Sequence, residues 1–235
     1  MKRKIMLWIA ISLALALIAG AVFYFAKLRP EQLKQAEHRA AVEQYRQAKW
    51  QQYQLENQQY ADGQVDVAFL GDSLTDGYDL QRYYPQYLVC NRGIGGDTTF
   101  DLEGRLQVSV YDLQPKVAVM LIGANNFSTM FDNYERILLG LQEHLPNSQI
   151  VLLSLTCMGQ EWGKNNQLAA YNNVKIRLLA EKYGFTFVDL YSPLMNLETG
   201  EIYPEYTTDG GHLTHLGYEV LTAQITPVLE ALLGK

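Results

Sequence analysis

The chain divides into three regions by its pattern of hydrophobic and polar positions. The first contains an uncharged run of 22 residues, Ile5 to Ala26, preceded by Lys2-Arg3-Lys4. A helix of that length crosses the roughly 30 Å hydrocarbon layer of a bilayer, so residues 1–29 predict a single-pass membrane anchor. Because basic residues stay on the cytoplasmic side, the chain after Lys27 is expected on the extracytoplasmic side of the cell membrane.

A cleaved signal peptide is the alternative for this region. Ala19-Gly20-Ala21 has the small-x-small pattern of a cleavage site. Cleavage there would leave the apolar stretch Val22-Phe23-Tyr24-Phe25 at a new terminus, and the run exceeds the ~15 residues of a usual signal core. We therefore favour the uncleaved anchor, and either alternative exports the rest of the chain.

The second region, residues 30–63, is rich in Gln, Glu, Ala, Lys and Arg and predicts one long helix. Pro30 suits its first turn and Gly63 suits its stop. Apolar positions are few until three aromatic residues that share one face: Trp50, Tyr53 and Tyr60. The last turns are expected to pack on the following domain, and the earlier ones to form a stalk.

The third region, residues 64–235, alternates short apolar runs with helical patterns. Runs typical of buried strands are Val65–Leu70, Tyr87–Cys90, Val117–Ile122, Ile150–Leu155 and Phe185–Leu190. Helical patterns are found at Thr98–Leu113, Met130–Leu145, Asn165–Tyr183 and His215–Leu233. This alternation predicts a parallel sheet of five strands covered on both faces, a three-layer α/β/α sandwich. Binding sites in such sheets form at the carboxyl ends of the strands.

A serine follows the first predicted strand at this edge, in Gly71-Asp72-Ser73-Leu74. Glycine permits a sharp turn and the next residues suit a first helical turn, so the Ser73 hydroxyl would lie near free backbone N–H groups. Enzymes display a nucleophile in this way. Gly, Asp and Ser are also ordinary turn and cap residues, so the tetrapeptide alone does not decide.

Two more loops are expected at the same edge. The stretch from Asn91 to Thr98 is glycine-rich and opens a helix, so a backbone N–H can approach a ligand there. Gly123-Ala124-Asn125-Asn126 offers an amide side chain as a neutral donor, unless its asparagines only cap a helix. The glycine spacing does not fit a dinucleotide fingerprint, and no phosphate-loop Gly-Lys-Ser/Thr occurs.

The last loop, Asp209-Gly210-Gly211-His212-Leu213-Thr214, precedes the final helix. A carboxylate three residues from an imidazole can accept the ring N–H and leave the other ring nitrogen free as a base. There are three alternatives: His215 is the base, His212 and His215 bind a metal, or both histidines are surface residues at the start of the helix. A metal site lacks a third ligand of convincing spacing, and we interpret His215 as a solvated helix residue.

Together these blocks resemble the SGNH (GDSL) hydrolases across residues 65–220, and the Gly93–Thr99, Gly-x-Asn-Asn and His212-Leu213-Thr214 segments are similar to the platelet-activating-factor acetylhydrolase catalytic-subunit branch. The resemblance implies the flavodoxin-like SGNH hydrolase fold, with no cofactor and no metal. It implies a catalytic triad of Ser73, Asp209 and His212. It also implies an oxyanion hole made by the N–H groups of Ser73 and Gly96 and the side chain of Asn125. Asn126 stands where the family usually has Asp.

Composition and charge argue against a disordered chain and against a nucleic-acid-binding protein. With 48% hydrophobic residues the chain can bury a sizeable core, so disorder is not expected. A net charge of -6, with no basic cluster beyond the first four residues, argues against a nucleic-acid partner.

Cys90 and Cys157 lie at the ends of the second and fourth predicted strands. Two other strands should separate these strands, which would place the two cysteines too far apart for a disulfide.

The expected function is therefore an outward-facing, membrane-anchored serine esterase. We expect a short acyl group, in particular acetyl, on a carbohydrate of the cell envelope. The loops Thr156–Lys164 and Tyr191–Thr208 should bring four side chains towards the cleft: Met158, Trp162, Tyr203 and Tyr206. The aromatic faces among them suit sugar rings. These side chains also suit a lipid chain, which leaves a lysophospholipase as an alternative. A non-catalytic envelope-glycan binding module is the rival of another class.

Overall fold

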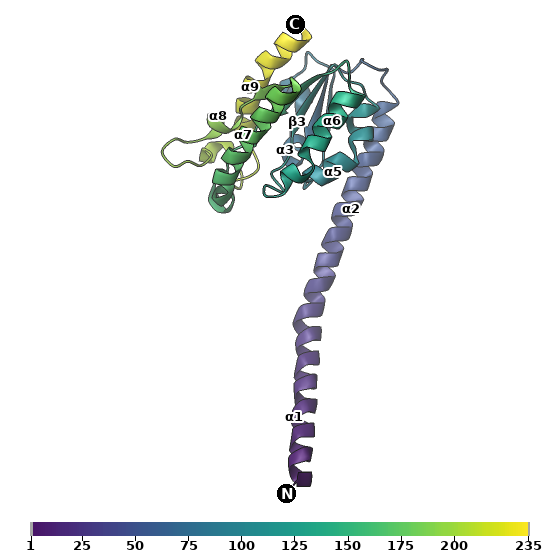
Figure 1. Cartoon of the computed structure of the whole chain (residues 1–235), viewed down its shortest axis with the longest axis vertical. Helices are drawn as coiled ribbons and strands as arrows, with labels where there is room; N and C mark the ends of the chain where they lie inside the picture. Colours follow the sequence, from purple (N-terminus) through teal and green to yellow (C-terminus); the bar gives the residue numbers. More distant parts are fainter. Residues whose placement is uncertain (1, 235) are drawn as a thin grey trace. The chain divides into compact units, whose positions relative to one another are not determined.

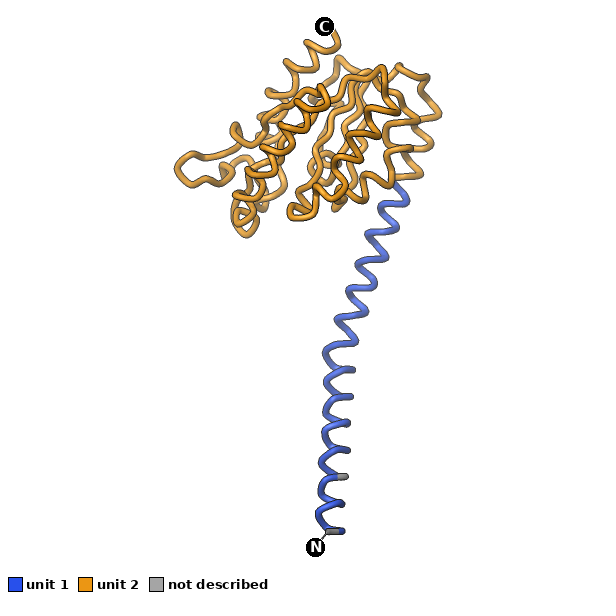
Figure 2. Tube along the Cα trace, viewed as in Figure 1, with its two compact units in different colours: residues 1–49 blue, residues 50–235 orange. Residues whose placement is uncertain are grey.

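The computed structural model describes residues 2–234. The chain forms two compact units, one up to Lys49 and one from Trp50 onward (Figure 2). Helix α1 (Lys2–Phe23) continues through a π-helical turn (Tyr24–Leu28) into α2 (Arg29–Asn57), whose last residues, from Trp50, belong to the second unit. In a regular helix the Pro30 ring would clash with the carbonyl group of Ala26, and the wider turn accommodates it. By length and composition this helix can cross a membrane, a property that an N-terminal signal sequence shares.

The second unit contains the predicted parallel sheet (Figure 1). Its strand order is β2-β1-β3-β4-β5, and every neighbouring pair is parallel. The strands are β1 (Val67–Gly71), β2 (Val89–Gly93), β3 (Val117–Leu121), β4 (Gln149–Leu153) and β5 (Thr186–Val188). The prediction of five parallel strands is confirmed, with shifts of a few residues at their ends.

Alternate residues of each strand point to two separate hydrophobic cores. In β1, Ala68 and Leu70 belong to one core, while Val67 and Phe69 belong to the other. The first core lies under α5 (Thr99–Gly104), α6 (Tyr134–His144) and α7 (Asn166–Tyr183). The second lies under α3 (Ser73–Asp76), α4 (Leu80–Tyr83), α8 (Tyr191–Leu194) and α9 (His215–Leu233). Helices on both faces confirm the three-layer sandwich.

Several helices differ from the sequence pattern. The helix predicted over Thr98–Leu113 stops at Gly104, and a π-helical turn follows at Gln107–Tyr111. The interruption places the buried Arg105 so that it reaches the end of β1. The helix predicted from Met130 begins with a 3-10 turn at Met130–Asp132. Further 3-10 turns are Gln160–Asn165 and Pro204–Tyr206.

The two cysteines form no disulfide, as predicted. Cys90 and Cys157 are both buried and free, and β1 and β3 lie between β2 and β4.

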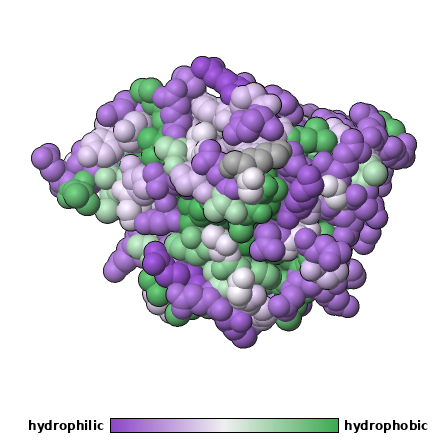
Figure 3. All heavy atoms as spheres, turned by 90° about the horizontal axis from the view of Figure 1, so that it is seen from above, coloured by the Kyte–Doolittle hydropathy of each residue, from purple (hydrophilic) through white to green (hydrophobic). Residues whose placement is uncertain are grey.

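Seen from above in Figure 3, most of the visible face is hydrophilic, with hydrophobic side chains gathered towards the middle of the view. The buried apolar side chains of the second unit gather mainly in its two cores.

Candidate active site

Ser73 directly follows the tight turn between β1 and α3. β1 ends at Gly71, and Ser73 is the first residue of α3 after the N-cap Asp72. A Cβ atom at Gly71 would lie 2.1 Å from Oγ1 of Thr75 and 2.3 Å from the carbonyl oxygen of Leu121, so no larger residue fits. The turn presents the serine at the carboxyl edge of the sheet.

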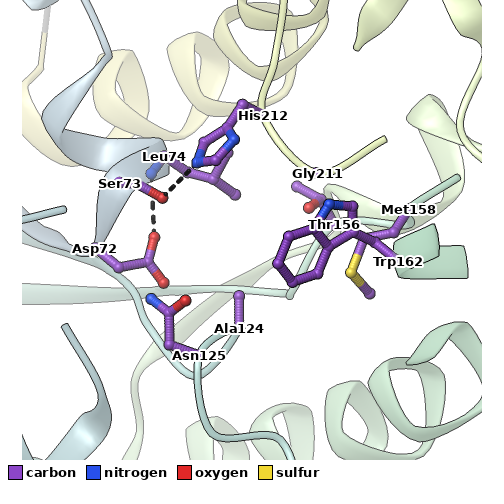
Figure 4. Close-up of a pocket in the computed structure, with 10 residues that line it drawn as sticks. All are labelled: Asp72, Ser73, Leu74, Ala124, Asn125, Thr156, Met158, Trp162, Gly211 and His212. Carbon is purple, nitrogen blue, oxygen red and sulfur yellow. Dashed lines mark hydrogen bonds between the residues drawn. The ribbon is translucent and has the colours of Figure 1, made fainter. Parts of the chain in front are cut away.

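The structure brings Ser73, His212 and Asp209 into one hydrogen-bonded chain. Nε2 of His212 lies 3.1 Å from Oγ of Ser73 (Figure 4). Nδ1 of the same ring lies 2.7 Å from Oδ2 of Asp209. A neutral ring protonated on Nδ1 donates to the carboxylate and leaves Nε2 to accept from the serine hydroxyl. The arrangement can therefore remove a proton from Ser73.

Asp209 is held in its ionised form. Its Oδ1 accepts the backbone N–H groups of Gly211 and His212 at 2.9 and 2.7 Å. The hydrogen bond from the His212 ring, followed by these backbone bonds, lowers the pKa of Asp209 to about 2. The carboxylate is thus charged wherever His212 can act as a base.

The loop that carries His212 is held by hydrogen bonds within the loop and by a close contact with Gly159. The His212 carbonyl oxygen accepts from the backbone N–H of Thr208 at 2.9 Å and from Oγ1 of Thr207 at 2.7 Å. Gly210 has a φ of 87°, and a Cβ atom there would lie 2.2 Å from the carbonyl oxygen of Gly159. Only glycine satisfies both the left-handed conformation and the close approach.

The candidate oxyanion donors come from two neighbouring loops. Nδ2 of Asn125 donates to the carbonyl oxygen of Asp97 at 2.9 Å, and its amide lies near Asp72 and Ser73 in the cavity (Figure 4). Gly96 is in the loop after β2, with a φ of 81° that favours glycine. Gly96 is not among the residues that line the cavity. The structure thus places Asn125 with Ser73 and Gly96 in the adjoining loop.

Asn126, where the family pattern usually has Asp, secures the start of α5. Its Oδ1 accepts the backbone N–H of Thr99 at 3.3 Å, and its Nδ2 donates to Oγ1 of the same residue at 2.9 Å. Oγ1 of Thr99 in turn donates to Asn133 at 2.6 Å. An amide supplies both the acceptor and the donor that this contact uses.

Arg105 connects the end of β1 with the loop that follows β2. Its side chain is buried, and its Nε donates to Oδ2 of Asp97 at 2.7 Å. Nη1 donates to the carbonyl oxygen of Arg92, and Nη2 to that of Gly71, both at 2.9 Å. One guanidinium therefore holds the end of β1, which precedes Ser73, together with the end of β2 and with Asp97 in the loop that follows β2.

Asp72 is a second buried carboxyl in the site. Oδ1 accepts the backbone N–H of Leu74 at 3.1 Å, and Oδ2 has no hydrogen-bond partner within the described part of the chain. Burial first, and then the charge of Asp97, raise the pKa of Asp72 to about 7, against the lowering effects of the Leu74 N–H and His212.

A small cavity of about 50 Å³ opens beside the Ser73 hydroxyl. Trp162 lies against Gly211, where a Cβ atom would be 3.4 Å from the indole Cδ1. Tyr203 and Tyr206, which we expected at the cleft, do not line it; their rings pack edge to face on each other. The lining residues are Asp72, Ser73, Leu74, Ala124, Asn125, Thr156, Met158, Trp162, Gly211 and His212 (Figure 4).

His215 is directed elsewhere. Its Nδ1 contacts the Tyr83 hydroxyl, and its Nε2 lies 2.9 Å from Nη2 of Arg82 and 3.0 Å from Oε1 of Glu219. Both nitrogens of His212 are already used by Ser73 and Asp209. Within residues 2–234 no three His, Cys, Asp or Glu side chains group as a metal site would require.

Sequence patterns identify the polar residues at the strand ends but not the residues that support them. Asp97 stands in the glycine-rich loop without a recognisable role, and Asp72 looks like an ordinary turn residue. Arg105 lies in a helical pattern, where an arginine most often faces solvent. Such buried polar contacts join residues far apart in the chain, so no local spacing marks them.

Comparison with known proteins agrees with this geometry. Solved structures of similar fold include a Streptococcus pneumonia protein provisionally described as a platelet activating factor, at 24% identity over 84% of this chain and 99% of that one, with a TM-score of 0.76. A GDSL-like lipase from Bacteroides thetaiotaomicron has 24% identity over 77% and 97%, with a TM-score of 0.69. An acetylxylan esterase from Geobacillus stearothermophilus has 22% identity over 72% and 95%, with a TM-score of 0.59. At these identities the likeness is one of fold.

A search of curated proteins finds no match to the chain. The model described as the GDSL-like lipase/acylhydrolase family matches residues 69–220, which is more than half of the chain. This match spans the segments of Ser73, Gly96, Asn125, Asp209 and His212, and it confirms the predicted resemblance. The chain therefore belongs to the GDSL-like lipase/acylhydrolase family of serine ester hydrolases.

Proposed function

We propose that this protein is a membrane-anchored, outward-facing esterase that removes short acyl groups, in particular O-acetyl groups, from carbohydrate of the cell envelope. The observation that carries the proposal is the hydrogen-bonded chain from Ser73 through His212 to Asp209, beside a cavity of about 50 Å³. Ser73, His212 and Asp209 are its catalytic triad.

In the first step Oγ of Ser73 attacks the carbonyl carbon of the ester while Nε2 of His212 takes the hydroxyl proton. The carbonyl electron pair moves onto its oxygen, and the imidazolium formed is stabilised by Asp209. The intermediate then collapses: the C–O bond to the alcohol breaks, and His212 gives its proton to the departing oxygen. An acyl-Ser73 ester remains.

In the second step water attacks the acyl-Ser73 ester with His212 again as the base. The bond between Oγ and the acyl carbon breaks, Ser73 recovers its proton, and the free acid leaves. The oxyanion of both steps is stabilised by the N–H groups of Ser73 and Gly96 and by Nδ2 of Asn125. Nδ2 of Asn125 has two hydrogens, and the bond to Asp97 uses one of them.

The size of the cavity supports a short acyl group. One water molecule needs at least ~10–15 Å³ of such volume, so about 50 Å³ admits only a few non-hydrogen atoms. Leu74, Ala124, Met158 and Trp162 give it apolar walls suited to a methyl group. Most of an octanoyl chain would therefore have to lie outside this volume.

Two observations support a carbohydrate as the alcohol. Trp162 is 45% exposed, so part of its indole is open to a sugar ring outside the cavity. The same fold serves an acetylxylan esterase. For location, Lys2-Arg3-Lys4 before the apolar helix favour a cytoplasmic N-terminus, which would place the esterase on the extracytoplasmic side.

The test compares esters on the full-length chain, with Ser73→Ala as control. We expect p-nitrophenyl acetate to be hydrolysed with a higher kcat/KM than the octanoate, and acetate to be released from O-acetylated envelope polysaccharide. A large preference for octanoate, with hydrolysis of lysophospholipid, would contradict the acetyl proposal and favour a lipid esterase. Glycan binding without hydrolysis of any ester would favour a binding module.

A further inference from the structure

The end of α2 packs on the loop that follows β2, although it precedes the segment matched by the family model. Tyr53 is 1% exposed and its hydroxyl donates to the carbonyl oxygen of Gly93 at 2.6 Å. Tyr53, Ile94 and Val108 form a hydrophobic cluster separate from the two main cores. The last two turns of α2 are therefore part of the hydrolase unit.

A buried charge strengthens this contact. The Arg92 side chain is fully buried at the end of β2, and its Nη1 pairs with Oε2 of Glu56 at 2.6 Å. Nη2 donates to Oδ1 of Asn57 at 3.0 Å, and the guanidinium lies 4.6 Å from the centre of the Tyr53 ring. A buried guanidinium is costly without such partners, so α2 supplies what Arg92 requires.

The same loop is bound to the turn of Ser73 by other contacts. The backbone N–H of Ile94 donates to the carbonyl oxygen of Gly71 at 3.1 Å, and that of Gly95 to Oδ2 of Asp76 at 3.2 Å. A Cβ atom at Gly93 would lie 2.2 Å from the backbone nitrogen of Asp76. The loop thus lies in contact with α3 as well as with α2, and Gly96 follows directly.

We propose that Tyr53, Glu56 and Asn57 are positioning residues of the hydrolase, which fix the loop of Gly96 through Arg92 and Gly93. The inference rests on the proposed role of Gly96 as an oxyanion donor. None of the three side chains lines the cavity. They act on the transition state, where the oxyanion develops, and not on the binding of a small ester.

The experiment uses the full-length chain with Tyr53→Phe, which removes only the hydroxyl that reaches Gly93. Active sites are counted by titration with a fluorophosphonate, and kcat and KM for p-nitrophenyl acetate are then measured. We expect kcat per active site to fall about tenfold, less than the loss of a whole donor, with KM changed less than about twofold. Glu56→Ala should act in the same direction, and Glu56→Gln, which keeps the acceptor oxygen, should recover part of the loss.

Tyr45→Phe is the matched control, because that ring is on the same helix and 40% exposed. A wild-type kcat in folded Tyr53→Phe would overturn the inference, as would a loss explained entirely by fewer titratable active sites. The Ser73→Ala variant distinguishes failure of the proposed function from failure of this inference. Full activity in Ser73→Ala would contradict the triad itself. An inactive Ser73→Ala together with a normal Tyr53→Phe would contradict only the positioning role of Tyr53.

Discussion

Nη2 of Arg105 donates to the carbonyl oxygen of Gly71 at 2.9 Å, two residues before Ser73. Through Nε the same guanidinium pairs with Asp97, and both side chains are almost fully buried. Arg105→Met should destabilise the fold by about 3–5 kcal/mol, because it leaves the Asp97 carboxylate buried without its cation. Urea unfolding of the two proteins measures this difference.

Arg136→Met is the control for that prediction. Arg136 pairs with Glu103 at the surface, and its side chain is 57% exposed. Breaking an exposed pair should cost less than about 1 kcal/mol. Equal losses in free energy of unfolding in the two variants would show that the buried Arg105–Asp97 pair stabilises the fold no more than an exposed pair does.

Asp72 should make stability depend on pH. Its pKa is raised from 3.8 to about 7 in the folded chain, chiefly by burial. The folded state therefore holds the Asp72 proton more tightly than the unfolded state does. The resulting contribution to the free energy of unfolding is complete below about pH 4 and is lost as the pH rises through about 7. It amounts to roughly 4 kcal/mol at most.

Asp72→Asn removes the ionisation and keeps an N-cap oxygen for Leu74. We expect the variant to gain stability relative to the wild-type chain between pH 4.5 and 8, measured as the difference in free energy of unfolding. A difference that stays constant over this range would mean that Asp72 titrates at its ordinary pKa.

The sequence predicted the sheet and the edge of the site because both have local signals. Apolar runs mark buried strands, and Ser73, Asn125 and His212 each occur in a short polar block at the end of a run. Arg105 and Arg92 gave no such signal, since their partners lie 34 and 36 positions away. Tyr53 was expected to pack on the domain, but its hydrogen bond to Gly93, 40 positions away, had no local signal. The direction of side chains in loops has no local signal either. Trp162 and Tyr203 were both expected at the cleft, and of the two only Trp162 lines the cavity.

Asp209 should affect turnover only through His212. With a pKa of about 2, lowered chiefly by the hydrogen bond from the His212 ring, Asp209 is ionised throughout the range above about pH 4. Its contribution to stability is likewise present above about pH 4 and lost as the pH falls towards 2.

Asp209→Asn should therefore lower kcat by about 10³–10⁴ while the fold is kept, because the His212 ring loses the carboxylate that fixes its tautomer. The kcat for p-nitrophenyl acetate and the circular dichroism spectrum of the variant check both statements. A folded variant with normal turnover would mean that Asp209 does not support the base.

Trp162 should set the length of the acyl group. Its indole lines the cavity beside Gly211, so Trp162→Ala opens that wall. The ratio of kcat/KM for p-nitrophenyl octanoate over acetate should rise about tenfold or more. Tyr171→Ala, an exposed aromatic on α7, is the control and should leave the ratio unchanged. An unchanged ratio in Trp162→Ala would mean that the acyl group lies elsewhere.

The direct test of the triad is the reactivity of Ser73 itself. A fluorophosphonate should label the full-length chain once, at Ser73, and the labelled protein should have lost its hydrolysis of p-nitrophenyl acetate. Ser73→Ala should show no label and turnover near background, and adding His212→Ala should cause little further loss because the two residues act as one unit. A Ser73→Ala protein that keeps most of its esterase activity would contradict the account.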